Sequence, residues 1–351
     1  MSAKSAFGLD TLILVPMGCL LIFAQFAQVI SPERIPLLAL TGLIFPYALL
    51  FFLAGLVVRI FRRFWKGLWW PIVLLILIYP SINSTIGFGG VNEFEVSLES
   101  VSITSFNVRR FDQFNWIKGA ETKSDILTWI SNNSTEIICF QEFPDFVKSD
   151  IASNLTAHKV YLTLRKTGPV TATSLKMINT ENWVPNGERY AKGLITDVVK
   201  GKDTLRVYNV HLQSIGLSSE DYDAVRDGTD AESRHRLLSR LISAYATRSS
   251  QIISLRKHID NSPYRVILAG DFNDTPVSYA LKTILASSEN DSHLLDSFYS
   301  SSKGLGATYV GDIPGLRIDY ILHSKSLLPH DFKTHDIELS DHRPISVNLS
   351  Y

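Results

Sequence analysis

The sequence predicts an α+β protein, a four-layered α/β sandwich of two mostly antiparallel sheets packed face to face with helices outside, preceded by three transmembrane helices. Three observations support this prediction. Three long uncharged stretches lie before Asn92, and after it short β-branched and apolar runs alternate with polar segments. Only a few long segments have helical periodicity, whereas a doubly wound parallel sheet would need a helix after nearly every strand.

Each uncharged stretch is long enough to cross a bilayer, which takes roughly 20 apolar residues. The stretches are Thr11–Pro32, Ile35–Val58 and Gly67–Asn92. They predict membrane helices at about 11–31, 36–58 and 67–87. A buried core helix or a cleaved signal peptide is the alternative for the first, but it lacks a convincing cleavage site. We therefore expect a membrane anchor over residues 1–91 and a catalytic domain over residues 92–351.

The positions of the cations predict the orientation of this anchor, because Lys and Arg beside membrane helices stay on the cytoplasmic side. Lys4 precedes the first expected helix, and a basic cluster from Arg59 to Lys66 separates the second from the third. Both features place the N-terminus in the cytoplasm. Three crossings would then make this a multi-pass protein of the cell inner membrane with an extracytoplasmic catalytic domain.

The composition after residue 90 argues against a disulfide-stabilised domain and mildly against a routine nucleic-acid partner. Only two cysteines occur, Cys19 and Cys139, so no disulfide framework stabilises the expected domain. That region holds 28 of the 34 Lys and Arg residues and 32 of the 34 Asp and Glu residues, a formal charge of −4. Since non-specific nucleic-acid binders usually carry a basic excess, this balance disfavours DNA or RNA as a routine partner.

The expected catalytic domain contains nine strand candidates and three helix candidates. The strands are Val101–Asn107, Glu136–Gln141, Lys159–Leu164, Thr171–Asn179, Gly193–Val199, Leu205–Leu212, Arg265–Ala269, Arg317–His323 and Ile345–Leu349. The helices are Thr122–Asn132, Ala231–Asp260 and Val277–Ala286. The second helix has apolar residues at spacings near 3.6 and is expected to bury one face on a sheet.

Several of these strands end in a polar residue that suits metal or phosphate binding. Asn107 and Arg109 follow the strand from Val101, and Glu142 follows the strand that ends at Gln141. A carboxylate there is a hard oxygen ligand suited to magnesium, although alone it would be read as a solvated strand end. Because strand ends meet at one edge of a sandwich, residues distant in sequence can converge there.

Histidines and further acids extend the pattern. His211 lies inside an apolar strand, where a hydrogen-bonded core histidine is the alternative interpretation. Asp271 and Asn273 follow the strand Val266–Ala269 and alternate onto one side, where they can hold a water or a metal oxygen between them; an Asx-rich turn is the alternative.

A buried acid and a histidine complete the candidate site. Asp319 lies between apolar neighbours, where a charge needs a partner, and His342 beside Asp341 can supply it. Pairing with an acid would raise the histidine pKa and keep it cationic beside a phosphate, or would make a structural ion pair.

Taken in order, the strings SFNVR, QE, NVHL, GDFND, RIDY and SDH resemble the endonuclease/exonuclease/phosphatase superfamily. This superfamily includes deoxyribonuclease-like nucleases, abasic endonucleases, neutral sphingomyelinases and inositol polyphosphate phosphatases, and the resemblance covers residues 99–350. Together with the expected anchor it indicates a membrane-anchored, bacterial-type member, and the resemblance implies that the protein uses Mg²⁺, or Mn²⁺ in its place.

The resemblance also implies roles for individual residues. Glu142 looks like the principal metal ligand, with Asn107 and Asp341 near the metal or the phosphate, and Arg109 as a substrate contact. Asp271 resembles the residue that orients or deprotonates the attacking water, and Asn273 the one that positions it. His211 is similar to the phosphate contact or leaving-group acid. His342, paired with Asp319, would stabilise charge on a non-bridging oxygen.

The sequence departs from the family's pattern in two places. Many nucleases of the family have an acid where this chain has Arg109, and some have a Glu or Asn near the position of Lys192. Arg109, Arg110 and Lys192 are therefore either phosphate contacts or surface cations. The departures leave the metal site intact and weaken any transfer of nuclease specificity.

The sequence thus predicts a membrane-anchored, metal-dependent phosphoester hydrolase that uses an activated water, with no covalent nucleophile and no obligate protein partner. Its substrate is a nucleic acid, which would make it a nuclease, or a phospholipid or small phosphoester, which would make it a phosphatase or a sphingomyelinase-like phosphodiesterase. A catalytically inactive, phosphate-binding scaffold is the remaining alternative.

Overall fold

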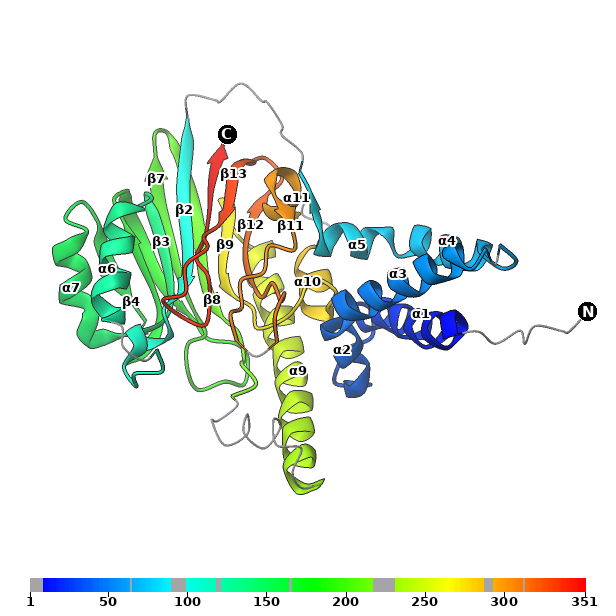
Figure 1. Ribbon diagram of the computed structural model, residues 1–351. Coiled ribbons are helices and arrows are strands. Elements are labelled where there is room, and N and C mark those ends of the chain that lie inside the picture. Colours follow the sequence, from blue (N-terminus) through cyan, green and yellow to red (C-terminus); the bar gives the residue numbers. More distant parts are fainter. Residues whose placement is uncertain are drawn as a thin grey trace, which may run out of the picture. The chain divides into compact units, whose positions relative to one another are not determined.

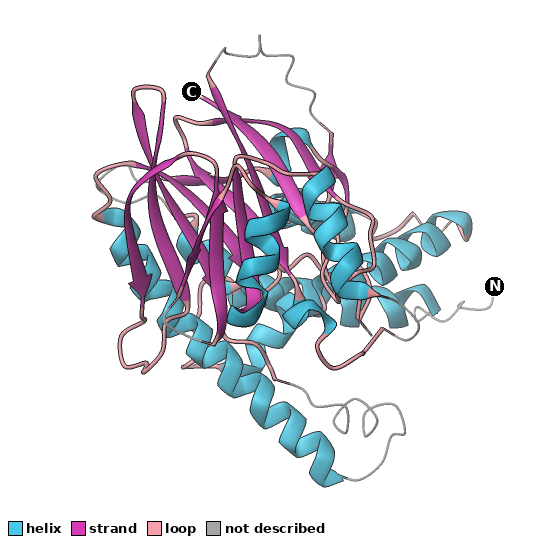
Figure 2. Cartoon of the chain, turned by 90° about the vertical axis from the view of Figure 1, so that its left-hand side faces the viewer, coloured by secondary structure: helices cyan, strands magenta, loops and turns pink. Residues whose placement is uncertain are grey.

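The computed structural model describes residues 9–63, 65–89, 99–117, 121–163, 166–216, 231–286, 293–311 and 313–351. The chain divides into two compact units (Figure 1). The helical unit comprises Met1–Thr85, Gly216–Ser249 and Asp274–Thr283, and the sandwich unit comprises Ile86–Ile215, Ser250–Asn273 and Ile284–Tyr351. All the described strands belong to the sandwich unit, and Figure 2 shows the strands in magenta and the helices in cyan. The expected boundary at residues 91 and 92 lies outside the described residues and stays a prediction.

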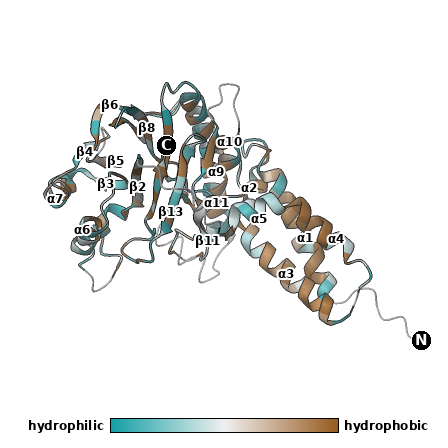
Figure 3. Cartoon of the chain, turned by 90° about the horizontal axis from the view of Figure 1, so that it is seen from above, coloured by the Kyte–Doolittle hydropathy of each residue, from teal (hydrophilic) through white to brown (hydrophobic). Residues whose placement is uncertain are grey.

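Five helices form the N-terminal part of the helical unit, and Figure 3 shows that α1, α3 and α4 are mostly apolar. They are α1 (Leu9–Ala27), α2 (Pro36–Leu43), α3 (Phe45–Phe61), α4 (Trp69–Leu77) and α5 (Tyr79–Thr85). Among the described residues one helix, over Asp10–Ala27, is long and apolar enough to cross a membrane. The bent pair α2 and α3 adds a second only if it counts as one broken span.

The prediction of three membrane spans is therefore wrong, and the multi-pass anchor and the orientation that rests on three crossings are not supported. Prolines explain the breaks. Pro46 and Pro80 each occupy the second position of a new helix. Proline lacks a backbone N–H, which is tolerated in the first turn of a helix, but in the interior of a continuous helix it would break the helix. The stretches expected at 36–58 and 67–87 are accordingly split, and α2 meets α3 at 60°.

Two mixed six-stranded sheets form the sandwich unit. The first contains, in spatial order, β10 (Leu294–Asp296), β12 (Asp319–Ser324), β9 (Arg265–Asp271), β8 (Asp203–His211), β7 (Gly193–Lys200) and β6 (Lys176–Trp183). The second contains β13 (Leu328–Thr334), β14 (Ile345–Ser350), β2 (Ser100–Asn107), β3 (Ile137–Pro144), β5 (Thr167–Thr173) and β4 (Lys159–Leu162). All neighbours are antiparallel except β8 with β9 and β2 with β3. The α+β class and the two face-to-face sheets are confirmed.

One predicted strand, Thr171–Asn179, is wrong, because the chain leaves one sheet and enters the other within it. β5 ends at Thr173 and β6 begins at Lys176 in the opposite sheet. Ser174 and Leu175 make the crossing; the Ser174 N–H donates to Glu136 O, and the Leu175 N–H to Thr173 Oγ1. A run of β-forming residues gives no sign of such a crossing. The end of the strand predicted to reach Leu164 lies outside the described residues.

Helices cover the outer faces of both sheets. α6 (Thr122–Asn132) and α7 (Lys148–Asn154) pack apolar side chains against the second sheet. α9 (Ala231–Asp260) has the predicted bounds, and in its sandwich-unit part Ile252, Leu255 and Ile259 are buried while His258 contacts Tyr208 of β8. The predicted helix Val277–Ala286 forms as α10 (Tyr279–Ile284). Short elements complete the chain: β1 (Gly87–Phe88), η1 (Arg109–Asp112), η2 (Asp145–Val147), α11 (Phe298–Ser301) and β11 (Lys303–Gly304).

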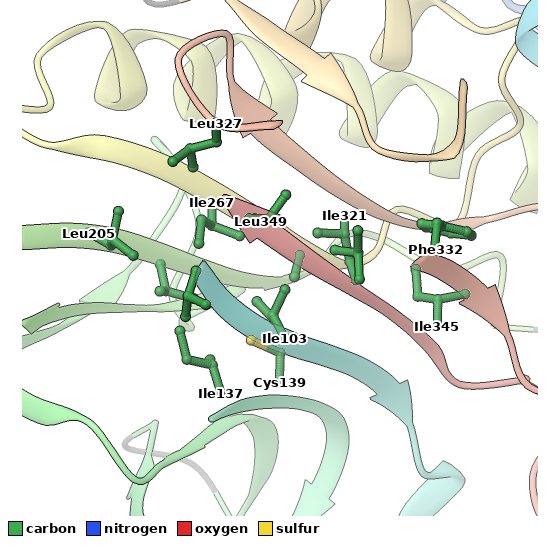
Figure 4. Close-up of a cluster of buried hydrophobic side chains, with 14 of the residues drawn as sticks. Ile103, Ile137, Cys139, Leu205, Ile267, Ile321, Leu327, Phe332, Ile345 and Leu349 are labelled. Atoms are coloured by element: carbon green, nitrogen blue, oxygen red, sulfur yellow. The ribbon is translucent and has the colours of Figure 1, made fainter. Parts of the chain in front are cut away.

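The core lies between the two sheets (Figure 4). Alternate residues of β2 and β14, such as Ile103 and Val347, face alternate residues of β8 and β9, such as Leu205 and Ile267. All of these side chains are at most 2% exposed. This apolar layer fixes the register of the strands, because a slip of one residue would turn every apolar side chain outward. The register in turn decides which residues meet at the strand ends.

Candidate active site

Strand register brings the sequence motifs to one end of the sandwich. Asp319, at the start of β12, lies opposite Asp271, at the end of β9. His211, at the end of β8, lies beside Asp271 on its other side. In the second sheet, Asn107 ends β2 beside Gln141 of β3. Strands that pair in this way force their terminal side chains together on a rigid support.

Asp271 is at the centre of the cluster and is 1% exposed. Its Oδ2 accepts a hydrogen bond from Asn107 Nδ2 at 2.9 Å. The same oxygen lies 3.6 Å from His211 Nε2 and 3.7 Å from His342 Nε2. His342 Nδ1 is 2.9 Å from Asp319 Oδ2, so the predicted pairing of Asp319 with His342 is present in the structure.

The surroundings give the two histidines opposite protonation states. Burial alone would lower the pKa of His342, but the carboxylates of Asp319 and Asp271 raise it well above the usual value. Burial lowers the pKa of His211, and the nearby Asp271 offsets this only in part. Burial raises the pKa of Asp271, against the opposing charge of His342. At neutral pH the site therefore holds a cationic His342 and a neutral His211.

Glu142 and Asp341 bring two carboxylates together at the opening of the site. Burial and then the charge of Asp341 raise the pKa of Glu142, while the Asn107 side chain hydrogen-bonds its carboxylate and lowers it. Glu142 has φ of 50°, in a bulge that interrupts the pairing of β3 with β5 between Phe140 and Phe143. Such a bulge redirects a side chain at the cost of backbone strain, which is common at functional sites.

These residues fit a divalent cation. The carboxylates of Glu142 and Asp341 are partly exposed, and the charge of Asp341 raises the pKa of Glu142. Arg109 beside Asp341 offsets part of this repulsion, a divalent cation would offset more, and oxygen donors suit Mg²⁺. A second group, Asp271, Asp319 and His342, has its donor atoms within 4.8 Å of one another. In that group His342 is already hydrogen-bonded to Asp319 and cationic, which favours an anion over a metal.

Two buried polar atoms in the site have no hydrogen-bond partner among the described residues. They are His211 Nε2 and Asp319 Oδ1. A buried polar atom without a partner costs about 1–3 kcal/mol, so its place in a native site calls for a ligand or an ordered water. His211 Nε2 lies 3.9 Å from Glu142 Oε1, which places this donor beside the carboxylate pair.

Two predicted residues have less direct positions. The Asn273 backbone N–H donates to Asp271 Oδ1, which makes the Asx turn that was the alternative interpretation. The Asn273 side chain donates from Nδ2 to Leu212 O and so stabilises this turn. Arg109 places Nε 3.3 Å from Asp341 Oδ2, beside the proposed metal ligands. The roles of all nine predicted residues stay predictions, although their positions bring them to one end of the sandwich.

One structural residue escaped the sequence analysis. Thr308 is fully buried, and its Oγ1 accepts hydrogen bonds from the N–H groups of Ile318 and Asp319 at 3.0 and 3.1 Å. Its carbonyl accepts from Arg343 N, and the next residue but one, Val310, donates to Asp341 O. Thr308 thus joins the segments that carry Asp319 and His342. It lies outside regular secondary structure, and no pattern in the sequence marks it.

A pocket of about 220 Å³ opens beside Glu142 and His211. Two cations considered in the sequence analysis, Arg110 and Lys192, both line it. Lys192 Nζ donates to Gln213 Oε1 at 2.9 Å. The remaining lining residues are Thr167, Gly168, Pro169, Ala191, Leu212, Gln213 and Ser214. Arg110 and Lys192 are therefore positioned to meet an anionic group next to the site.

Comparisons with known proteins agree with this arrangement. The endonuclease/exonuclease/phosphatase family matches residues 104–342, and a domain of unknown function matches residues 9–85. No curated protein matches the sequence.

Solved structures share the fold of the sandwich unit. One is D. rerio TDP2 complexed with single strand DNA product, at a TM-score of 0.54 and 16% identity, covering 72% of this chain and 99% of that chain. The human Nocturnin catalytic domain with bound sulfate anion has a TM-score of 0.51 and 17% identity, covering 72% and 93%. An endonuclease/exonuclease/phosphatase from Bacteroides vulgatus has a TM-score of 0.52 and 15% identity, covering 72% and 98%. At these identities the likeness concerns the fold alone.

Proposed function

The chain belongs to the endonuclease/exonuclease/phosphatase family, and from this premise we propose that it is a metal-dependent phosphoester hydrolase that uses an activated water. The observation that carries the proposal is the placement of Asp271. This buried carboxylate contacts an amide and faces two imidazoles, one of which is paired with Asp319. A buried general base beside one cationic and one neutral imidazole suits attack on a phosphorus centre.

Each group has one task in the proposed reaction. Burial raises the pKa of Asp271, which accepts a proton from the attacking water and orients that water toward phosphorus. Asn107 holds the Asp271 carboxylate in place. His342 carries the positive charge that stabilises a non-bridging oxygen. His211 is neutral and donates its Nε2 hydrogen to the phosphate or the leaving oxygen. The tautomer that donation requires is the one with the proton on Nε2.

Glu142 and Asp341, with Asn107, are the residues that would hold a magnesium ion, and Mn²⁺ has similar donor preferences. A bound ion would neutralise charge on the phosphate and lower the pKa of a water. Arg109, 3.3 Å from Asp341, adds a fixed cation beside this group. The substrate is a phosphoester, and nucleic acid is one proposed class because TDP2 of similar fold is described with a single strand DNA product.

Hydrolysis of a generic diester tests the proposal. The full chain with Mg²⁺ is expected to release p-nitrophenol from bis-p-nitrophenyl phosphate, and addition of a chelator should remove the activity because the metal-holding carboxylates lose their ion. Conversion of supercoiled to nicked plasmid, measured in parallel, separates a nuclease from a small-molecule or lipid phosphoesterase. Turnover that persists in full after chelation would contradict the metal-dependent mechanism.

We also propose that the helical unit associates with a lipid bilayer, without assigning a number of crossings. Large apolar side chains on α1, α3 and α4 are exposed within the described residues: Leu12 64%, Leu50 62%, Phe61 83%, Trp69 70% and Leu77 70%. Apolar patches of this extent mark membrane or partner contacts. The charged residues of these helices are confined to one end, where Asp10 pairs with Arg59 and Arg62.

Vesicle flotation tests this association. The full chain is expected to float with phospholipid vesicles, and the double variant Leu12→Asn, Leu50→Asn should remain at the bottom of the gradient, since both side chains are exposed and their loss costs little packing. Ile178→Asn, which changes an equally apolar side chain that is 47% exposed on β6, is the matched control and should float. A wild-type chain that does not float would refute the proposal.

A further inference from the structure

The loop from Arg109 to Ile117 borders the candidate active site and has an unusual backbone. Arg109, Arg110, Phe111 and Asp112 all have positive φ, between 41° and 56°, as does Asn115 at 51°. Non-glycine residues adopt this region at an energetic cost, so the surrounding contacts must hold the loop in place. A rigid loop at the edge of a site is suited to present side chains to a substrate.

The contacts that hold the loop come from both of its ends. Asn107 Oδ1 accepts from Arg109 N, which ties the loop to a candidate metal ligand. The buried Asp112 carboxylate accepts from the backbone of Trp116 at 2.7 Å and from Thr122 Oγ1 at 3.0 Å. Asp112 is 7% exposed, so these bonds are sheltered from water. The position of Trp116 is therefore fixed relative to the metal-holding residues.

Two aromatic rings of this loop each carry an arginine on one face. The Arg109 guanidinium lies 4.1 Å from the centroid of the Trp116 ring, and that of Arg110 lies 5.7 Å from the Phe114 ring. The two rings meet edge to face at 5.2 Å. Trp116 nevertheless remains 39% exposed and Phe114 55% exposed. Large apolar rings at the surface, next to cations and a catalytic cluster, call for an occupant.

The two arginines connect the rings to the site. Arg109 Nε is 3.3 Å from Asp341, and Arg110 lines the pocket that also contains Glu142 and His211. A phosphate bound next to Glu142 and Asp341 would therefore have Arg109 or Arg110 between it and each ring. Arginine on an aromatic face is a good surface for a flat group that is attached to an anion. The arginines also repel cationic groups such as a choline or ethanolamine headgroup.

We propose that Trp116 and Phe114, braced by Arg109 and Arg110, form a stacking subsite for the base of a nucleotide whose phosphate occupies the candidate active site. This inference rests on the proposed function and names its substrate class. In a nucleotide one sugar separates the base from the phosphate. Here one arginine side chain, that of Arg109, separates the Trp116 ring from Asp341, so a base on the ring and a phosphate in the site could belong to one nucleotide. Base stacking on aromatic side chains tolerates any base sequence. The acidic balance after residue 90 favours a mononucleotide or a chain end over a long polyanion.

Binding measurements on the full chain, in an Asp271→Asn background with Mg²⁺, test the subsite. Thymidine 5′-monophosphate is expected to bind at least about fivefold more tightly than deoxyribose 5-phosphate, the lower end of the effect of stacking one base. Trp116→Ala should remove this difference and Trp116→Phe should retain most of it. Ile178→Ala, at an exposed apolar site on β6, should leave it unchanged. A 5′-phosphorylated tetrathymidylate that binds more tightly than the mononucleotide would identify a nucleic-acid end, and equal affinity a free nucleotide.

Several results would overturn the inference. Equal affinity for the two phosphates, or binding of neither, would exclude a base subsite. A Trp116→Ala variant that weakens both ligands equally would show a structural role for the ring. If the Leu12→Asn, Leu50→Asn variant still bound anionic phospholipid vesicles and lost that binding on Trp116→Ala, with no preference for the nucleotide, the rings would belong to a lipid surface. Failure of the hydrolase proposal is seen separately, as absence of metal-dependent turnover of bis-p-nitrophenyl phosphate by the wild-type chain.

Discussion

Replacing Asp271 by Asn is expected to reduce turnover by roughly 10²–10⁴-fold, the range that a positioned general base contributes, while the chain remains folded. The amide fills the same space, but neither its oxygen nor its nitrogen is basic enough to accept a proton from water near neutral pH. The substitution also removes a carboxylate that raises the pKa of His342, so the site loses a base and part of its positive charge together. Rates on bis-p-nitrophenyl phosphate and thermal unfolding, measured on the same preparation, check both expectations.

The matched control is Asp197→Asn. Asp197 is also a buried carboxylate on the first sheet, 2% exposed, but it pairs with Arg206 through two hydrogen bonds of 2.7 and 2.8 Å. Its loss should lower the free energy of unfolding and leave the rate of the folded protein unchanged. If Asp271→Asn instead kept a tenth or more of the wild-type rate, Asp271 would not be the base. A physiological role that survives Asp271→Asn would favour the phosphate-binding scaffold.

Replacing Asp319 by Asn is expected to move the alkaline limit of activity to lower pH. In the wild-type chain Asp319 and Asp271 keep His342 protonated well above its usual pKa, so activity falls only as pH rises through that raised value. An amide at position 319 cannot stabilise the imidazolium in the same way, and a neutral His342 no longer stabilises charge on phosphate. Profiles of kcat against pH for the two proteins give the comparison.

The same pairing makes a prediction about stability. The pKa of His342 is higher in the folded chain than in the unfolded chain, so its contribution to the free energy of unfolding is complete below the unfolded pKa and is lost as pH rises through the folded pKa. Asp319→Asn should flatten this part of the stability profile. The control is His335→Gln, because burial lowers the His335 pKa and its Nε2 contacts Ser346 Oγ instead of an acid. If the wild-type chain, Asp319→Asn and His335→Gln all lost activity at the same alkaline pH, His342 would have no role in the mechanism.

The residues of the candidate site were predictable because chemistry and strand ends coincide in the sequence. Asp271 comes one glycine after the apolar run Val266–Ala269, and Asp319 begins an apolar strand, so their types and places stand out. Their meeting depends on the register of β12 on β9, which the interleaved core imposes. Helices α6 and α9 were predicted with their observed bounds because both have apolar residues at helical spacing and polar residues between them.

What escaped prediction depends on contacts between segments that are distant in sequence. Nothing in the sequence around Thr308 indicates its role, because that role depends on hydrogen bonds from the N–H groups of Asp319 and Arg343, which are distant in sequence. Trp116 could equally have been a core residue, and only its exposure and the Arg109 stack suggest a binding surface. In the helical unit, hydropathy counts the apolar residues on either side of Pro46 as one stretch, although its ring breaks the helix.

The order of the strands has a consequence for protein synthesis. β14 is inserted between β13 and β2, and Ile345 lies opposite Ser105, so Asp341 and His342 reach Asn107 only when β14 has docked. A nascent chain that leaves the ribosome N-terminus first can already contain His211 and Asp271 but lacks the imidazolium and the second carboxylate. Because such long-range pairing is slow relative to local folding, activity begins with the docking of this strand. Unfinished translation products are therefore expected to lack the proposed hydrolase activity.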